Sequence, residues 1–292
     1  MRDRDHDIDL RVGLIGSGIE ESLSPALHEE EARALGIRCT YELYDFEALD
    51  LSPTDLGAVL SELRADGLRG VNVTHPCKQR VVEHLDELSR QAAAMGAVNT
   101  VVFEEGRTVG HNTDWPGFAE GFRQGMPGAR VDEVVLVGAG GAGTAVAHAS
   151  LELGARVLHV VDDDRSRAEE LVTALGPAAR AAGPEDLARL LGAADGLVHA
   201  TPTGMASHPG VAIDPELLHP GLWVAEVVYR PLVTPLLERA RERGCRTLDG
   251  GRMAVFQAAY AFELFAGVRP DPDRMLMHFA HLAAEEGAWT RA

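Results

Sequence analysis

Three glycines in a short segment form a turn that could bind the phosphates of a dinucleotide. Gly138, Gly140 and Gly143 fit the pattern Gly-x-Gly-x-x-Gly, directly after the apolar run at residues 134–137. In a strand–turn–helix unit the first glycine permits the tight turn, the second lets the backbone approach a pyrophosphate, and the third lets helix and strand pack closely. The N-terminus of the helix then presents free N–H groups to the phosphates. The pattern therefore predicts a dinucleotide site, whose turn also contains Ala139, Gly141 and Ala142.

A carboxylate follows this turn at the distance typical of a ribose ligand. Asp162 ends the next apolar run, nineteen residues after Gly143. A carboxylate at this position accepts hydrogen bonds from the adenosine ribose hydroxyls, which favours NAD. Asp163 and Asp164 add negative charge that would repel the 2′-phosphate of NADP, and one charge pair at ~4 Å and an effective dielectric of ~20 is worth about 4 kcal/mol. Arg167 is near but does not occupy the strand end. The sequence predicts NAD, with NADP as the less favoured cofactor.

The first half of the chain carries polar residues suited to the oxidation of an alcohol. Nicotinamide chemistry on an alcohol needs a proton donor and acceptor at the carbinol and groups that hold the substrate. The candidates are Ser22, Ser24, Thr74, Lys78, Asn99 and Asp114. Each has an ordinary structural explanation when taken singly, such as a helix cap for Ser24 or a turn residue for Asn99. Their joint placement at the ends of apolar runs indicates a site, because polar side chains just past the carboxyl ends of parallel strands face the ligand.

Alternating strands and helices are expected to position both the predicted cofactor residues and the polar residues of the first half. In the first half, strands are predicted over 10–15, 39–44, 70–73 and 97–103, and helices over 25–35, 53–65 and 86–94, with Ser24 as the N-cap of the first helix. In the second half, strands are predicted over 131–137, 156–161, 196–200 and 222–228, and helices from the glycine turn to about residue 153 and over 166–175, 252–265 and 273–284. This alternation is typical of an α/β fold with a parallel sheet. The boundary between two domains is predicted near a bridging helix at 115–127.

Composition restricts the partners of the chain. Its 292 residues include 27 basic and 45 acidic side chains, a net charge of −18 that argues against nucleic acid. No apolar run is long enough to cross a membrane. The polar start at residues 1–9, expected to be solvated, lacks the apolar segment of a secretory signal, which predicts a cytoplasmic protein. Cys39, Cys77 and Cys245 show neither a disulfide framework nor a zinc spacing, so free, packed thiols and no metal site are expected. An oligomer is possible but cannot be read from the sequence.

Eight motifs, taken in order, resemble those of shikimate dehydrogenases. They are Ser22-x-Ser24-Pro25, Asn72-Val73-Thr74-x-Pro76-x-Lys78, Gly96-Ala97-Val98-Asn99-Thr100, Asn112-Thr113-Asp114, Gly138-Ala139-Gly140-Gly141-Ala142, Ala200-Thr201-Pro202-x-Gly204, Asp249-Gly250 and Gln257-Ala258-Ala259. The resemblance extends over residues 10–265, nearly the whole chain. It implies an N-terminal α/β substrate-binding and catalytic domain at 1–114, completed by C-terminal helices that return to it at 252–292. A Rossmann NAD-binding domain is implied at 115–251.

The resemblance also implies roles for individual residues. Lys78 and Asp114 correspond to the catalytic pair, in which the lysine exchanges a proton with the ring oxygen and the aspartate orients the ammonium group. Ser22 and Ser24 correspond to the hydroxyls that bind the substrate carboxylate. Thr74, Asn99, Tyr229 and Gln257 correspond to positions that bind ring hydroxyls or the carboxylate. Besides the glycine turn, cofactor contacts are implied at Asp162, Arg167, Thr201, Pro202, Val228 and Gly250.

Three departures from the family pattern bear on specificity. NADP-using members commonly carry Asn-Arg-Thr where this chain has Asp162-Asp163-Asp164, so it resembles the NAD-linked quinate/shikimate dehydrogenase branch. Quinate-using members often have threonine where this chain has Ser24, which favours shikimate. His199 stands where asparagine commonly precedes Ala-Thr-Pro, and we expect it to be packed or hydrogen-bonded, with no chemical role.

The resulting prediction is an NAD-dependent oxidoreductase that interconverts 3-dehydroshikimate and shikimate. Its substrate would be a small anionic polyhydroxy ring carboxylate. Quinate or an amino analogue of shikimate or quinate would satisfy the same residues and remains an alternative. A second alternative is a dinucleotide-sensing regulator without turnover, against which the intact pair of Lys78 and Asp114 argues.

Overall fold

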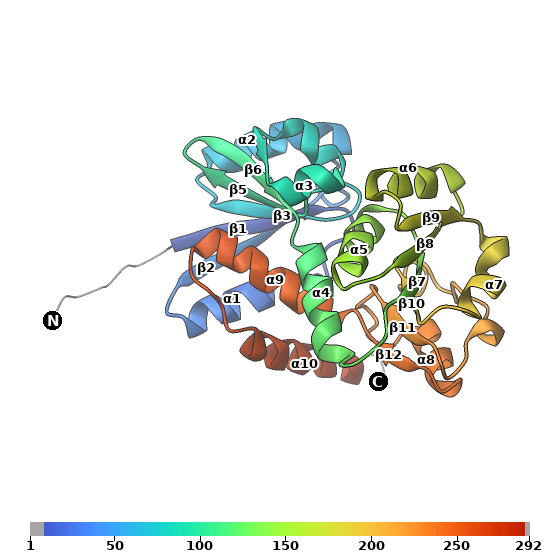
Figure 1. The fold of residues 1–292 in the computed structure, drawn as a ribbon. Coiled ribbons are helices and arrows are strands. Elements are labelled where there is room, and N and C mark those ends of the chain that lie inside the picture. Colours follow the sequence, from blue (N-terminus) through green and yellow to red (C-terminus); the bar gives the residue numbers. More distant parts are fainter. Residues whose placement is uncertain (1–8, 290–292) are drawn as a thin grey trace. The chain divides into compact units, whose positions relative to one another are not determined.

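The computed structural model describes residues 9–289, with side chains described through residue 285. The chain forms two compact units (Figure 1). Unit 1 contains the residues up to Thr113 and those from Ala258 onward, and unit 2 is Asp114–Gln257. Each unit has one six-stranded sheet with helices on it, so the predicted α/β architecture is confirmed. Residues 1–8 of the predicted polar start lie outside the described residues.

The sheet of unit 1 is mixed, which corrects the expectation of a parallel sheet throughout. Its order is β2-β1-β3-β5-β6-β4, with bounds β1 Asp9–Gly16, β2 Arg38–Asp45, β3 Gly70–Val73, β4 Glu87–Leu88, β5 Thr100–Glu104 and β6 Arg107–His111. β1 pairs in parallel with β2 and β3, whereas β5 is antiparallel to both β3 and β6. The start of β5 and the end of β6 therefore lie at the same edge of the sheet as the ends of β1 and β3. We call this the carboxyl edge of unit 1.

Helices cover both faces of this sheet. α2 (Leu56–Ala65) and α3 (Arg90–Met95) pack on one face in a cluster with β1, β3 and β5, and the other face packs against α1 (Ser24–Ala34) and the second half of α9 (Gly251–Ala266). The helix predicted over 86–94 begins only at Arg90, because β4 pairs with β6 and the Ser89 side chain caps the helix. Ser24 is the first residue of α1 rather than its N-cap, which is Leu23. The first turn of the predicted helix at 53–65 is a 3₁₀ turn.

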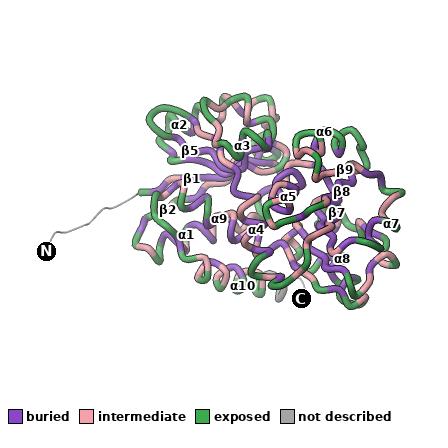
Figure 2. The backbone as a smooth tube through the Cα atoms, viewed as in Figure 1, coloured by how far each residue is buried: buried purple, intermediate pink, exposed green. Residues whose placement is uncertain are grey.

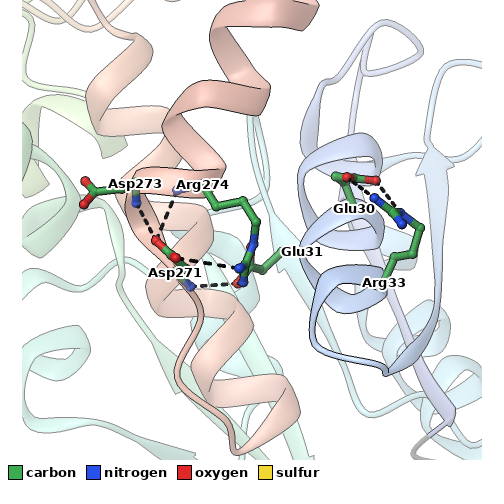
Figure 3. A network of polar contacts seen from close by, with 6 residues as sticks. All are labelled: Glu30, Glu31, Arg33, Asp271, Asp273 and Arg274. Atoms are coloured by element: carbon green, nitrogen blue, oxygen red, sulfur yellow. Dashed lines mark hydrogen bonds and ion pairs between the residues drawn. The ribbon is translucent and has the colours of Figure 1, made fainter.

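The last helix, α10 (Pro272–Trp289), is fastened to α1 by a charged network (Figure 3). The guanidinium of Arg274 donates to both carboxylate oxygens of Glu31, at 2.8 and 2.6 Å. The backbone N–H of Asp271 donates to Glu31 as well, at 2.7 Å. The side chain of Glu31 is only 1% exposed, so a buried carboxylate on α1 receives three donors from the segment that begins α10. This contact joins the C-terminal residues to α1 within unit 1, and such a return of the C-terminal helices is what the family resemblance implies.

Unit 2 has the doubly wound arrangement expected of a Rossmann domain. Its strands are β7 Glu133–Val137, β8 Val157–Val161, β9 Ala179–Ala182, β10 Gly196–His199, β11 Trp223–Glu226 and β12 Arg246–Leu248, all parallel, in the order β12-β11-β10-β7-β8-β9. Numbered within the unit this order is 6-5-4-1-2-3, with the switch in direction between β7 and β10. α4 (Asp114–Gly125), α5 (Gly141–Glu152) and α6 (Arg165–Leu175) pack on one face, and α7 (Leu187–Leu191) and α8 (Pro235–Glu242) on the other.

Burial follows this layering. Figure 2 shows the strands of both sheets largely buried and the outer faces of the helices exposed. Cys77 and Cys245 are buried and Cys39 is half-buried, and all three are free thiols, as expected. Among the described residues, no helix combines the length and apolar character that a membrane crossing requires.

Candidate active site

The glycine turn of unit 2 has the geometry that its sequence predicts. Gly138 has a φ of +105°, which side-chain-bearing residues rarely adopt. A Cβ at Gly143 would collide with the carbonyl oxygen of Gly138, so only glycine allows α5 to begin this close to the end of β7. Gly140 is the N-cap of α5, and the space where its Cβ would stand is open among the described residues. The first N–H groups of α5 follow at Gly141 and Ala142, where a pyrophosphate would be held.

The carboxylate of Asp162 lies against this turn. Its Oδ2 accepts the N–H of Ala139 at 2.7 Å, and its Oδ1 accepts the N–H of Asp164 at 2.9 Å. Arg167 is the positively charged residue among the predicted cofactor contacts. Its Nε lies 3.6 Å from the carboxylate of Asp164. The end of β8 therefore carries carboxylates next to the glycine turn, and Arg167 is paired with Asp164, the N-cap residue of α6.

The other predicted cofactor residues follow neighbouring strands of the same sheet. Thr201 and Pro202 follow β10, and a Cβ at Gly138 would lie 3.0 Å from the methyl carbon of Thr201. Val228 follows β11, and a Cβ at Gly250 would come 2.6 Å from its carbonyl oxygen. The structure thus brings Gly138 next to Thr201 and Gly250 next to Val228, all at the carboxyl ends of parallel strands.

In unit 1, Thr74 and Asn99 lie at the carboxyl edge. The methyl group of Thr74, just past β3, lies beside Gly16 at the end of β1. Asn99 is 3% exposed, donates to the hydroxyl of Thr113 at 2.9 Å and accepts the N–H of Thr113 at 2.7 Å. Asn99 therefore joins the start of β5 to the end of β6. Since Thr113 directly precedes Asp114, Asn99 also helps to place the chain at the predicted catalytic aspartate.

The predicted catalytic residues belong to different units. Lys78 is half-buried in unit 1, and its carbonyl oxygen accepts the N–H of Val98 at 2.9 Å, which places it beside the segment that leads to Asn99. Asp114 is the first residue of α4 and of unit 2, and is 4% exposed. Tyr229 and Gln257 also belong to unit 2, where Gln257 donates to the carbonyl of Ala254 at 3.0 Å.

Asp45, which the sequence reasoning missed, organises the segment that carries the two predicted carboxylate-binding serines. At the end of β2 its carboxylate accepts the N–H groups of Gly18 at 3.1 Å and Ile19 at 2.6 Å. The carbonyl of Ile19 accepts the N–H of Ser22 at 2.9 Å. The Ser22 hydroxyl accepts the N–H of Ser24 at 3.2 Å, which leaves its own proton available to donate. An acidic residue at the end of a predicted strand was the available signal.

The charge of Asp45 is maintained by the backbone. Burial by itself would raise the pKa of this carboxyl, but N–H donors from Ile19, Glu47 and Gly18 outweigh burial and hold the pKa below its usual range. Asp45 is therefore an ionised acceptor at neutral pH, which makes its hydrogen bonds strong.

Comparison with known proteins identifies the family. Residues 14–101 match the shikimate dehydrogenase substrate binding domain. A protein of Streptomyces avermitilis named shikimate dehydrogenase (NADP(+)) is 59% identical over 277 residues, which are 93% of this chain and 95% of that protein. The chain belongs to the shikimate dehydrogenase family. The predicted family membership is confirmed.

Other members of the shikimate dehydrogenase family carry a different cofactor in their names. A Corynebacterium efficiens protein named quinate/shikimate dehydrogenase (NAD(+)) is 46% identical over 283 residues, covering 95% of this chain and 99% of that protein. The solved structure of the Corynebacterium glutamicum quinate dehydrogenase in complex with NAD has a TM-score of 0.87 and 45% identity, and it covers 94% of this chain and 99% of that one. The fold prediction, an α/β substrate domain and a Rossmann domain, is thereby confirmed.

Proposed function

We propose that this chain is an NAD-linked dehydrogenase that interconverts 3-dehydroshikimate and shikimate. Family membership supports the reaction class and a nicotinamide dinucleotide as cofactor, whereas the names of relatives include both NADP and NAD. The observation that carries the choice of NAD is the Asp162 carboxylate, held 2.7 Å from the N–H of Ala139 in the glycine turn. In this position it can accept both adenosine ribose hydroxyls and would repel a 2′-phosphate.

In this proposal the cofactor-binding and catalytic residues have separate roles. The glycine turn holds the pyrophosphate, Asp162 holds the adenosine ribose, and Thr201, Pro202, Val228 and Gly250 line the remainder of the cofactor site. When bound, the nicotinamide would supply or accept the hydride. Lys78 exchanges the proton of the reacting ring oxygen, and Asp114 orients its ammonium group.

The substrate is held by residues of complementary hydrogen-bonding type. Ser22 and Ser24 donate hydroxyl protons to the ring carboxylate. Thr74, Asn99, Tyr229 and Gln257 bind the remaining polar groups of the ring. Ser24 in place of threonine favours shikimate over quinate. Quinate is a second candidate substrate, since relatives that are 46% and 45% identical are named for it.

Initial rates with shikimate and quinate, each with NAD and NADP at one pH, test this proposal. We expect the highest kcat/KM for shikimate with NAD. A Lys78→Ala variant is the control for the chemistry, with a loss in turnover of about 10²- to 10⁴-fold, the usual contribution of a general acid–base group.

Two other results would lead to different conclusions. A preference for NADP would contradict the role given to Asp162. Dinucleotide binding without turnover of either ring would favour the regulator, which binds the cofactor but performs no reaction.

A further inference from the structure

A buried histidine–glutamate pair lies at the ends of two neighbouring strands in unit 2. His199 is the last residue of β10 and Glu226 the last residue of β11, and the two are in register in the parallel ladder. Nδ1 of His199 lies 2.8 Å from Oε1 of Glu226, and both side chains are fully buried. Burying two such polar groups is unfavourable unless their hydrogen-bonding capacity is satisfied. The remaining hydrogen-bond partners of His199 and Glu226 therefore show which segments the pair connects.

The carboxylate of Glu226 organises the backbone that follows β11. Its Oε1 also accepts the N–H groups of Val227 at 3.0 Å and Val228 at 3.2 Å. Its Oε2 accepts the hydroxyl proton of Thr234 at 3.0 Å, and the Thr234 oxygen in turn caps α8. The chain at Val227–Val228 is thus folded over a single buried carboxylate.

The imidazole of His199 extends this network to the segment after β10. Nδ1 faces Glu226, and Nε2 on the other side of the ring faces the segment after β10. The hydroxyl of Thr201 lies within hydrogen-bond distance of Nε2. The same hydroxyl oxygen accepts the N–H of Thr203 at 3.3 Å. One imidazole therefore connects the segment at Thr201 with the segment at Val228.

The order of the strands indicates which part of a dinucleotide these segments face. The glycine turn follows β7, and Asp162 follows β8 on one side of it. β10 and β11 lie on the other side of β7. A dinucleotide whose pyrophosphate lies at the glycine turn and whose adenosine ribose lies at Asp162 must extend its other half toward the ends of β10 and β11.

We propose that His199 and Glu226 position Thr201 and the Val228 backbone for the nicotinamide half of the cofactor, without touching the cofactor themselves. The inference rests on the proposed function, because it assumes that the chain binds NAD. It makes His199 a positioning residue whose loss weakens one half of the cofactor site and spares the other.

The chain offers a matched control for this idea. His159 on β8 and Glu133 at the start of β7 form a second histidine–glutamate pair in the same sheet, with Nε2 and Oε1 2.9 Å apart. His159 is 7% exposed, but its partner stands at the amino end of β7, away from the glycine turn. A substitution there removes a second, more exposed histidine–glutamate contact of the same sheet without reaching the strand ends that face the cofactor.

The test measures the binding of two ligands, NAD and ADP-ribose, to the wild type and to the variants His199→Leu, His199→Asn and His159→Leu by titration calorimetry. ADP-ribose contains the adenosine, the pyrophosphate and the second ribose but lacks the nicotinamide. We expect His199→Leu to weaken NAD by about 10- to 100-fold, the range for losing a hydrogen bond to a charged group, and ADP-ribose by no more than about twofold. His199→Asn, which keeps a donor and an acceptor, should restore most of the NAD affinity, and His159→Leu should leave the ratio of the two affinities unchanged.

Several results would overturn the inference. Equal weakening of NAD and ADP-ribose in His199→Leu would show that the pair only stabilises the fold, and unchanged NAD affinity would show that it positions nothing. If His199→Leu does not fold, Glu226→Gln is measured with the same two ligands. This variant retains the side-chain shape, but its amide has one acceptor oxygen where the carboxylate has two. A wild type that binds neither ligand would instead refute the proposed function.

Discussion

The buried His28 should make the stability of this protein depend on pH, and the size of the effect follows from its surroundings. His28 lies on α1 and is 1% exposed. Within the part of the chain that the structure describes, neither of its ring nitrogens has a hydrogen-bond partner. The ring packs 4.9 Å from that of Tyr41 and 6.0 Å from those of Phe262 and Phe265. Burial in this apolar environment lowers the pKa of His28 from 6.5 to about 3.

The lowered pKa means that the unfolded chain binds the proton more tightly than the folded chain does. The contribution of the neutral His28 to stability is complete above pH 6.5 and is lost as the pH falls toward about 3. At about 1.36 kcal/mol per unit, the difference between 6.5 and about 3 corresponds to roughly 5 kcal/mol at full protonation. Between pH 7.5 and 5.0 the expected loss is about 2 kcal/mol, since pH 5.0 lies 1.5 units below the pKa of the unfolded histidine.

The assay is urea unfolding, followed by circular dichroism, of the wild type and of His28→Phe at pH 7.5 and 5.0. Any change in packing caused by the larger ring acts at both pH values and cancels in the comparison. Burial also lowers the pKa of His111 and His148, but both remain in the variant and cancel as well. We expect the loss between the two pH values to be about 2 kcal/mol smaller in His28→Phe than in the wild type. The exposed His281 supplies the control His281→Phe, which should keep the wild-type loss. Equal losses in the wild type and in His28→Phe would refute the reasoning.

Three further outcomes are expected. Asp162→Ala should raise the KM for NAD by about tenfold or more, because it removes a charged acceptor, and should affect NADP less; an unchanged ratio of kcat/KM for the two cofactors would contradict the role of Asp162. Arg274→Met should cost about 3–5 kcal/mol of unfolding free energy, because it strips the guanidinium from the buried carboxylate of Glu31. Glu31→Gln should lower the unfolding free energy by less than Arg274→Met, because the side chain of Arg274 is 34% exposed and remains hydrated. Equal losses of the two variants in urea unfolding would argue against this account. Asp45→Asn should raise the KM for shikimate about tenfold without changing the affinity for NAD, because an amide offers one acceptor where the backbone presents several donors; a loss of NAD binding would show that the change spreads beyond unit 1.

Several features of this protein could be predicted from the sequence because their causes are local. The glycine turn depends on backbone conformation and close packing at Gly138 and Gly143, which the residue types express directly. Four strands of unit 2, namely β7, β8, β10 and β11, are short, largely apolar and separated by helices, and this pattern is typical of a buried parallel sheet. Asp162 could be assigned to a strand end because one strand, one turn and one helix separate it from the glycines.

Other features were decided only by tertiary structure, because they depend on which distant segments become neighbours. The hairpin of β5 and β6 makes the sheet of unit 1 mixed, and β6 was not predicted at all. β4, β9, β12, α7 and α8 were also not predicted, since each is short and depends for its stability on packing against its neighbours.

The hydrogen-bond partners of buried polar side chains were also decided only by tertiary structure. Asp45 acts on a segment 26 residues earlier in the chain, and His199 is joined to Glu226, 27 residues later. Spacing along the chain does not reveal such partners, because strand pairing brings them together. Residue types and local spacing therefore determined the fold class and the candidate residues. Strand order and register decided which polar groups hold those residues in place.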